Sequence, residues 1–400
     1  MYEAVIGLEI HCQLLTERKL FSPEGHGAGA TPNHYVSPVT LAHPGTLPRV
    51  NRRPFELAIR MGLAGGSEIT RHNRFDRKNY FYPDLPKGYQ LTQYQTPICR
   101  GGRIAFRNEA GEMTSVRLHQ IHLEEDAGKS IHTGGDHSLL DFNRAGVPLI
   151  EVVTAPDLRS AEDAARCLQA VRRLVRYLDV CDGNLEAGSL RCDANVSVRR
   201  RGTTELGPKV EIKNLNSFRH VARAVEWEIE RQTDLASRGE TVVSETRLYD
   251  VAAGTTHAMR TKEALNDYRY FPDPDLPPVV VTDAWIAEIS AAMPPLPADL
   301  MRQFTEEAGL TAQDAEALVE ERPLAELYRA TLAHTPHAKA AANWLLGPVK
   351  QHLNETNLPV AALTLRPEQL AGLVDLVAEG RTSFAQAAKE ILPALLDDPT

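Results

Sequence analysis

Several segments in the first part of the chain alternate hydrophobic and polar residues, which is the pattern of β-strands that bury one face. In residues 5–12, apolar side chains at every second position alternate with polar positions that include Glu9 and His11. Residues 189–199 and 210–213 repeat this alternation. The pattern predicts strands with one apolar and one polar face.

A fourth polar run, residues 122–126, adds carboxylates to this set. If the run is extended, His122, Glu124 and Asp126 share one face. The pattern alone leaves two interpretations open. The polar faces can be separate and solvated, as is usual in antiparallel sheets. Alternatively, the strands face a common concavity and hold divalent cations against nucleotide phosphates, since such cations prefer carboxylate oxygens.

The chain changes character after the Pro-rich stretch 293–297. Strand patterns end there, and four segments with helical spacing follow, at residues 314–333, 336–353, 367–376 and 383–396, with Gly380 placed to end the third. Helix signals also occur earlier, at residues 160–178 and 217–231, and the first of these follows a Ser N-cap. We therefore predict an α+β domain with an antiparallel sheet in residues 1–293 and an all-α domain in residues 298–400.

Composition narrows the class of protein. The chain has 400 residues, 42% hydrophobic and 24% charged, as in ordinary globular proteins, and it contains no stretch apolar enough to span a membrane. Its N-terminus has no signal-peptide features, which predicts a cytoplasmic location. Five cysteines without close pairs fit a reduced compartment. The net charge of -9 predicts that any contact with RNA is local.

Common catalytic motifs are absent from the sequence. It contains no P-loop, no GxGxxG after a strand, no HExxH and no GxSxG elbow. Its cysteines and serines also lack the sequence context of a nucleophile. The usual nucleotide-binding folds and acyl-enzyme chemistry are therefore disfavoured.

Two runs, residues 75–89 and 267–275, interleave aromatic and basic residues. Such runs suit base stacking and phosphate binding, and they equally suit a rigid loop packed by its own rings. We assign packing to most of the rings. Lys78, Lys87 and Arg269 are the better functional candidates, because long cations in such loops rarely serve as core.

Seven strings in the first domain are long and distinctive. They are residues 5–11 (VIGLEIH), 75–90, 121–129, 141–151 (DFNRAGVPLIE), 186–198 (EAGSLRCDANVSV), 211–218 (EIKNLNSF) and 267–277. In this order they resemble the B subunits of the bacterial aspartyl/glutamyl-tRNA(Asn/Gln) amidotransferases, the GatB/GatE family. The resemblance implies a cradle-shaped domain with the glutamine synthetase-like fold, followed by a helical domain related to the YqeY proteins.

The resemblance also implies an activity and partners. In this family an amidase A subunit releases ammonia from glutamine, a small C subunit ties A to B, and a polar tunnel carries ammonia to B. There ATP, with Mg²⁺, phosphorylates the side-chain carboxylate of misacylated Glu-tRNA(Gln) or Asp-tRNA(Asn). Ammonia captures the acyl phosphate and gives Gln-tRNA(Gln) or Asn-tRNA(Asn). The sequence does not decide between the two tRNAs or give the number of ions.

The same resemblance implies roles for individual residues. The Mg²⁺ ligands are Glu9, His11, Glu124 and Glu151. Asp193 and Glu211 bind further metal or orient the substrate. The phosphate-binding residues are Arg191, Lys213, Arg269 and Ser189. The ammonia path includes Lys78, Lys87 and Glu125.

The sequence departs from the family in two places. Many relatives carry cysteine pairs for zinc, but the corresponding segments here are Leu20–Pro23 and Ser37–Thr40, which predicts no zinc. Relatives also continue into a tail domain that approaches the tRNA, and we expect it to be absent from this chain. Two other functions fit the same residues: a stand-alone ATP-dependent amide ligase for a small carboxylate, and a non-catalytic tRNA-binding scaffold.

Overall fold

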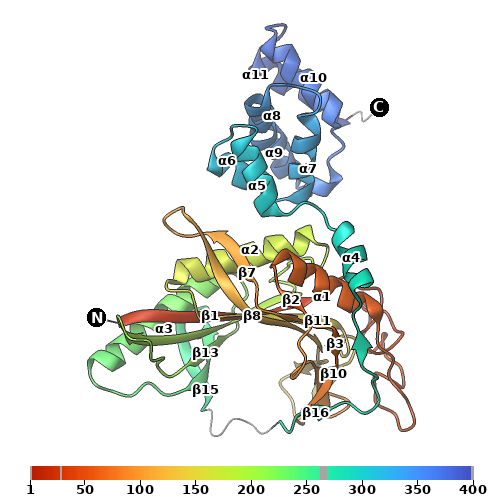
Figure 1. Ribbon diagram of the computed structural model, residues 1–400, viewed down its shortest axis with the longest axis vertical. Helices are drawn as coiled ribbons and strands as arrows, with labels where there is room; N and C mark the ends of the chain where they lie inside the picture. The colour runs from red at the N-terminus through yellow and green to blue at the C-terminus, as the bar shows by residue number, and fades with distance from the viewer. Residues whose placement is uncertain (1, 28, 262–267, 398–400) are drawn as a thin grey trace. The chain divides into compact units, whose positions relative to one another are not determined.

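The computed structural model describes residues 2–27, 29–261 and 268–397, and the chain forms two compact units, residues 1–293 and 294–400. Within the described residues, the first unit combines a large mixed sheet with helices, and the second unit is helical (Figure 1). The predicted α+β class and the predicted helical second part are confirmed. Asp267, the first residue of the second aromatic run, lies outside the described residues.

The large sheet contains thirteen of the described strands. They are β1 (Tyr2–Gln13), β2 (Glu68–Ile69), β4 (Asp76–Asn79), β5 (Tyr89–Thr92), β6 (Cys99–Arg100), β7 (Arg103–Arg107), β8 (Met113–Glu125), β11 (Pro148–Thr154), β12 (Leu190–Arg200), β13 (Val210–Lys213), β14 (Glu245–Asp250), β15 (Thr255–Thr261) and β16 (Phe271–Pro272). Two short pairs join β9 (Lys129–His132) to β10 (Ser138–Asp141) and β3 (His72–Asn73) to β17 (Val279–Val280). The main path runs β15-β14-β13-β12-β1-β11-β8-β5-β4-β16.

Strand β1 lies in the middle of this path, antiparallel to both β11 and β12. Its residues Ile6, Leu8 and Ile10 are fully buried, whereas Glu9 and His11 are half-buried on the other face. The alternation of the sequence therefore corresponds to two different faces of one central strand. The described pairings of the large sheet are antiparallel as predicted, except that β13 and β14 run parallel.

Four helices belong to the described part of the first unit: α1 (Arg52–Ala64), α2 (Ala161–Tyr177), α3 (Phe218–Ser237) and α4 (Asp283–Ala291). The predicted α2 and α3 begin where their caps place them, because the hydroxyls of Ser160 and Ser217 each accept an amide hydrogen from the first turn. Helix α2 packs against α3 and β1. Helices α1 and α4 were not predicted from the sequence.

The second unit consists of helices that only partly match the predicted ranges. They are α5 (Pro297–Glu306), α6 (Ala312–Val319), α7 (Arg322–Thr331), α8 (Ala338–Trp344), α9 (Lys350–Thr356), α10 (Pro367–Ala378), α11 (Phe384–Gln386) and α12 (Leu392–Asp397). The single helix predicted over residues 314–333 is wrong. Because Pro323 has no amide hydrogen, it is accommodated in the first turn of a new helix, α7. Gly380 follows α10 with a φ of 71°, as predicted for a residue that ends a helix.

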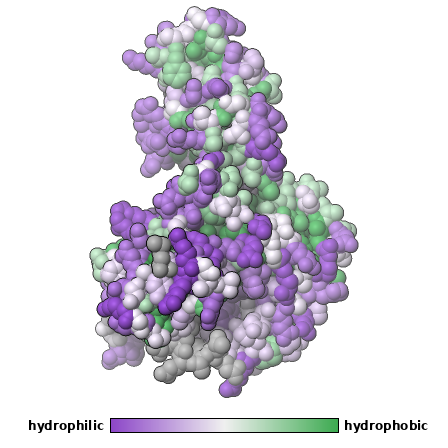
Figure 2. Space-filling view, turned by 60° about the vertical axis from the view of Figure 1, so that its left-hand side comes forward, coloured by the Kyte–Doolittle hydropathy of each residue, from purple (hydrophilic) through white to green (hydrophobic). Residues whose placement is uncertain are grey.

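Three further features concern the surface, the helices and the cysteines. Hydrophilic side chains cover much of the face seen in Figure 2. None of the helices within the described ranges combines the length and the apolar character that a bilayer-crossing segment needs. All five cysteines are buried free thiols.

Candidate active site

Polar residues of neighbouring strands form rows across one face of the large sheet. In one row, His11 on β1 lies opposite Arg191 on β12 and Glu151 on β11, and Glu151 in turn lies opposite His122 on β8. Directly opposite residues share a face. The register therefore brings residues from four strands together, although they are far apart in the sequence.

Three of the predicted site residues form a compact cluster. His11 Nε2 lies 3.4 Å from Glu124 Oε1 and 3.6 Å from Glu151 Oε2. One potential ligand atom from each of these three residues lies within 4.8 Å of the other two. Two carboxylates and one imidazole at this spacing can surround a single cation, since metal–ligand distances are about 2.0–2.6 Å.

His122 joins this cluster, although the sequence-based set of site residues omits it. Its Nε2 lies 3.1 Å from Glu151 Oε2 and 3.6 Å from Glu124 Oε2. Burial lowers the pKa of His122, but the carboxylates of Glu151 and Glu124 raise it by more, to about 10. Conversely, burial raises the pKa of Glu151, and the two histidines and Lys78 together bring it below its usual value. The sequence did contain a signal for His122: it stands two residues before Glu124 in an alternating strand, and such residues share a face.

Glu9 lies beside the cluster but is not one of its three close ligand groups. It is opposite Asp193 across β1 and β12, and Asn195 Nδ2 donates a hydrogen bond of 2.8 Å to its Oε1. Burial is the main reason that the pKa of Glu9 is raised, with a further contribution from Glu151. The site therefore continues from the cluster along β1.

Two of the three predicted phosphate-binding cations are held by carboxylates in the sheet or directly after one of its strands. Lys213 Nζ lies 2.6 Å from Asp193 Oδ2 and 3.1 Å from Glu211 Oε1. Arg191 donates a hydrogen bond of 2.8 Å to Asp126. Burial lowers the pKa of Lys213, but Asp193 and Glu211 outweigh it and raise the pKa above its usual value. Both cations are thus fixed in position by their partners, and Lys213 keeps its charge.

The remaining predicted residues lie in different surroundings. The hydroxyl of Ser189 is hydrogen bonded to Asp182 and to the carbonyl of Asn184, within the loop before β12. Arg269 is exposed, with a φ of 49°, and Asn79 Nδ2 donates to its carbonyl. Lys78 Nζ lies 4.9 Å from the ring centroid of Tyr268 and is close enough to Glu151 to lower its pKa. Lys78 therefore belongs to the surroundings of the cluster.

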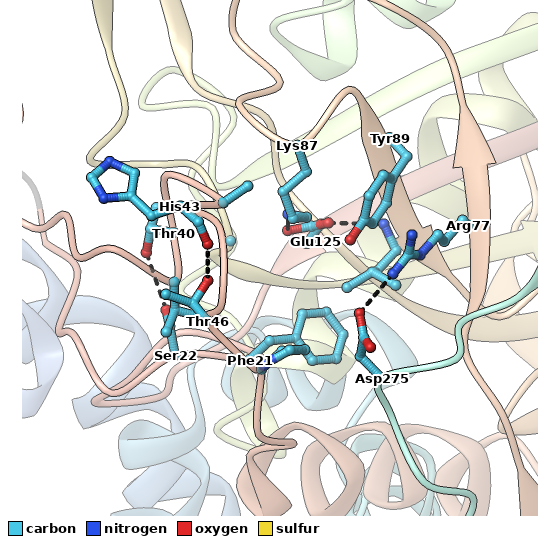
Figure 3. A pocket seen from close by; sticks show the side chains of 15 residues that line it. Phe21, Ser22, Thr40, His43, Thr46, Arg77, Lys87, Tyr89, Glu125 and Asp275 are labelled. Carbon is cyan, nitrogen blue, oxygen red and sulfur yellow. Dashed lines mark hydrogen bonds and ion pairs between the residues drawn. The ribbon is translucent and has the colours of Figure 1, made fainter.

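A cavity of about 250 Å³ contains the predicted Lys87 and Glu125 (Figure 3). Lys87 Nζ lies 2.6 Å from Glu125 Oε2, and Tyr89, Arg77 and Asp275 lie beside this ion pair. The opposite wall includes Ser22, Thr40, His43 and Thr46, which come from the segment between β1 and α1. The cavity wall therefore combines these polar side chains with apolar ones, among them Phe21, Val39 and Leu91.

The cavity and the cluster lie on opposite sides of β8. Glu124 and Glu125 are consecutive residues of this strand, so their side chains point to opposite faces. Glu124 contacts His11 and His122 in the cluster, whereas Glu125 contacts Lys87 in the cavity. A single strand thus contributes one carboxylate to each compartment.

Lys19 is buried next to the cavity. It is fully buried, and its Nζ donates hydrogen bonds to the carbonyls of Tyr35, at 2.6 Å, and Phe142, at 3.3 Å. Burial lowers the pKa of Lys19 to about 8, although Glu24 and Glu125 oppose the shift. Lys19 therefore links the loops that contain Tyr35 and Phe142 through hydrogen bonds, although burial disfavours its charged form.

The Lys19→Met variant is expected to change how stability depends on pH. Between about pH 8 and the ordinary lysine pKa of about 10.5, folded Lys19 is neutral while the unfolded chain still binds the proton, so stability rises with pH. Across this pH window, the unfolding temperature of the wild type should therefore rise by about 3 °C relative to that of Lys19→Met. Calorimetry at pH 7.5 and 10.5 measures this difference. Lys129→Met, which changes an exposed lysine, serves as the control. If the unfolding temperature of the wild type rises equally relative to both variants, the lowered pKa of Lys19 is contradicted.

The fold and the cluster define a class of protein: an α+β unit that carries carboxylates and imidazoles on a polar sheet face, followed by a helical unit. The family model of the GatB/GatE catalytic domain matches residues 4–287, and the model described as the GatB domain matches residues 326–400. The chain belongs to the GatB/GatE family.

Curated relatives agree with this assignment. The B subunit of the aspartyl/glutamyl-tRNA(Asn/Gln) amidotransferase of Thermosynechococcus vestitus is 49% identical over 405 residues, which cover 99% of this chain and 81% of the relative. The protein of the same name from Myxococcus xanthus is 50% identical over 392 residues, with 98% and 81% coverage. That from Bdellovibrio bacteriovorus is 48% identical over 382 residues, with 96% and 80% coverage.

Proposed function

We propose that this chain activates the side-chain carboxylate of glutamate or aspartate on a misacylated tRNA with ATP and amidates it. The products are Gln-tRNA(Gln) and Asn-tRNA(Asn), and the ammonia comes from a partner glutaminase. The observation that carries the proposal is the convergence of His11, Glu124 and Glu151 on one sheet face. The names of the relatives supply the substrate class.

The donor set of the cluster fits Mg²⁺. Glu124 and Glu151 offer the oxygen ligands that this ion prefers, His11 offers a nitrogen, and His122 orients both carboxylates. When bound, the ion neutralises charge that develops on the transferred phosphoryl group. Glu9, with Asp193 and Glu211, extends the acidic surface toward β13 and suits a further ion or the orientation of the substrate.

The cations of the sheet suit the phosphates of ATP. A carboxylate is a poor electrophile until one of its oxygens carries a phosphoryl group, and phosphoryl transfer depends mostly on positioning and charge stabilisation. Arg191 and Lys213 are fixed by carboxylate partners on the same sheet as the cluster. We assign phosphate binding to these two residues, and to Arg269 from the loop before β16.

The cavity beside β8 suits the delivery of ammonia. The polar residues of its lining, with the Lys87–Glu125 ion pair, lie on one side of the strand, and Lys78 lies on the side of the cluster. Ammonia arriving from a partner amidase subunit would pass the ion pair and reach the acyl phosphate near Lys78. A small C subunit that ties the amidase to this chain completes the proposed complex.

Glu124→Gln tests the proposed function in the complex assembled with the amidase and small subunits. Amidation of charged tRNA should fall at least about 100-fold, because a ligand of the cluster loses its charge, while tRNA binding is kept. Rates of ATP hydrolysis and amidation, with and without charged tRNA, measure this. Glu112→Gln, which changes an exposed carboxylate just before β8, should behave as wild type. Unchanged amidation in Glu124→Gln would favour a scaffold, and ATP turnover without tRNA would favour a ligase for small carboxylates.

A further inference from the structure

Two tyrosines from distant parts of the chain form a stacked pair near the cluster. The rings of Tyr94 and Tyr270 are parallel to within 8°, with centroids 4.1 Å apart. Tyr268 meets Tyr270 edge-on at 5.9 Å, and Tyr80 meets Tyr268 at the same distance. Tyr94 remains 60% exposed although its ring is stacked. An aromatic ring is thus held at the surface, backed by three others.

The backbone on both sides of the stacked pair is anchored. The amides of Tyr94 and Gln95 both donate to Asp76 Oδ2, at 3.0 Å each, and Asp76 is fully buried. On the other side, β16 pairs with β4 directly after Tyr270, with Phe271 opposite Arg77. The pair is therefore preorganised, which reduces the entropy lost when a ligand binds.

The charges around the pair favour an anionic ligand. The guanidinium groups of Arg74 and Arg100 donate to the side chain and the carbonyl of Gln95, the residue next to Tyr94. Both arginines are exposed. Neither has a carboxylate partner among the described residues. Planar guanidinium groups beside an aromatic ring suit a phosphodiester backbone whose base lies on the ring.

The pair also lies close to the cluster. Burial, the neighbouring tyrosines and the carboxylates of Glu124 and Glu151 raise the pKa of the Tyr270 phenol above its usual value. Lys78, which is near Glu151, contacts the ring of Tyr268. Thr92, two residues before Tyr94, lies opposite Glu124 in the sheet, so the stacked pair lies in the neighbourhood of the cluster.

From this geometry we infer that the exposed face of Tyr94 is a stacking platform for an unpaired adenine nucleotide, with Arg74 and Arg100 beside its phosphates. The inference rests on the proposed function, which supplies two sources of this chemistry: the adenine of ATP and the terminal adenosine of the charged tRNA. Stacking on an aromatic ring tolerates either source, because every base offers a π-face.

The test compares Tyr94→Ala, Tyr94→Phe and Tyr82→Ala in the assembled complex. Tyr82 is an apt control because it is 58% exposed and also lies in the first unit. Equilibrium binding of ATP and, separately, of uncharged tRNA is measured first. The Michaelis constants for ATP and charged tRNA follow. Tyr94→Ala should weaken one of the two ligands about tenfold, whereas Tyr94→Phe keeps the ring and should behave as wild type.

The ligand whose binding is weakened identifies the source. If only ATP binds more weakly, its adenine stacks on Tyr94, and if only tRNA binds more weakly, the terminal adenosine does. Unchanged binding of both ligands would overturn the inference. So would a defect of Tyr94→Ala confined to assembly with the partner subunits, since Tyr94 would then be an interface residue. Equilibrium binding does not require turnover, so a failure of the proposed amidation would be distinguished from a failure of the platform.

Discussion

Glu151→Gln is expected to reduce amidation at least about 100-fold with either glutamine or ammonium as the nitrogen source, and to raise the Mg²⁺ concentration needed for half-maximal rate. Glu151, like Glu124, contacts both histidines. Its Oε2 lies 3.6 Å from His11 Nε2 and 3.1 Å from His122 Nε2. A neutral amide keeps the shape of the side chain but loses the charge that attracts a cation. Initial rates across a Mg²⁺ titration, and Mn²⁺ binding followed by electron paramagnetic resonance, measure the change.

Glu3→Gln provides a control on the same sheet face. Glu3 is at the start of β1 and pairs with Arg199 at 2.8 Å, and the cluster residue His11 lies near the other end of this strand. Its substitution should leave both readouts unchanged. A Glu151→Gln variant with a normal Mg²⁺ requirement would show that the cluster is a structural network of charges and would remove the metal assignment.

Lys87→Met is expected to lower glutamine-dependent amidation at least about tenfold, while amidation driven by ammonium chloride stays within about twofold of wild type. Lys87 pairs with buried Glu125 inside the cavity, and this pair does not contact the cluster directly. Its loss should therefore affect the passage of ammonia more than the chemistry at the carboxylates. Parallel assays with the two nitrogen donors separate the two effects.

Removing one partner of a buried ion pair also leaves an unpaired charge, which costs about 3–5 kcal/mol. The double variant Lys87→Met with Glu125→Gln removes both charges and serves to isolate this effect. If the double variant recovers stability but not glutamine-dependent amidation, the pair acts in the path. Equal loss with both nitrogen donors would contradict a role restricted to ammonia passage, and exposed Lys129→Met should match wild type.

Local sequence signals accounted for much of the secondary structure. The cap Ser160 and the terminating Gly380 were predicted from the sequence because capping and left-handed backbone depend on one or two residues. The break between α6 and α7 was missed because Ala- and Leu-rich spacing continues across Pro323. Helices α1 and α4 were also missed.

Sequence by itself determined the family, the α+β class and the polar face of β1, since strand alternation and distinctive strings are properties of the chain order. Only the tertiary structure decided that His11, Glu124 and Glu151 meet, that His122 belongs with them, and that Glu125 faces a separate cavity. The physical reason is strand register: a slip of one residue moves every side chain of a strand to the other face. The stacking of Tyr94 on Tyr270 likewise depends on loops brought together by the sheet, and no local pattern encodes it.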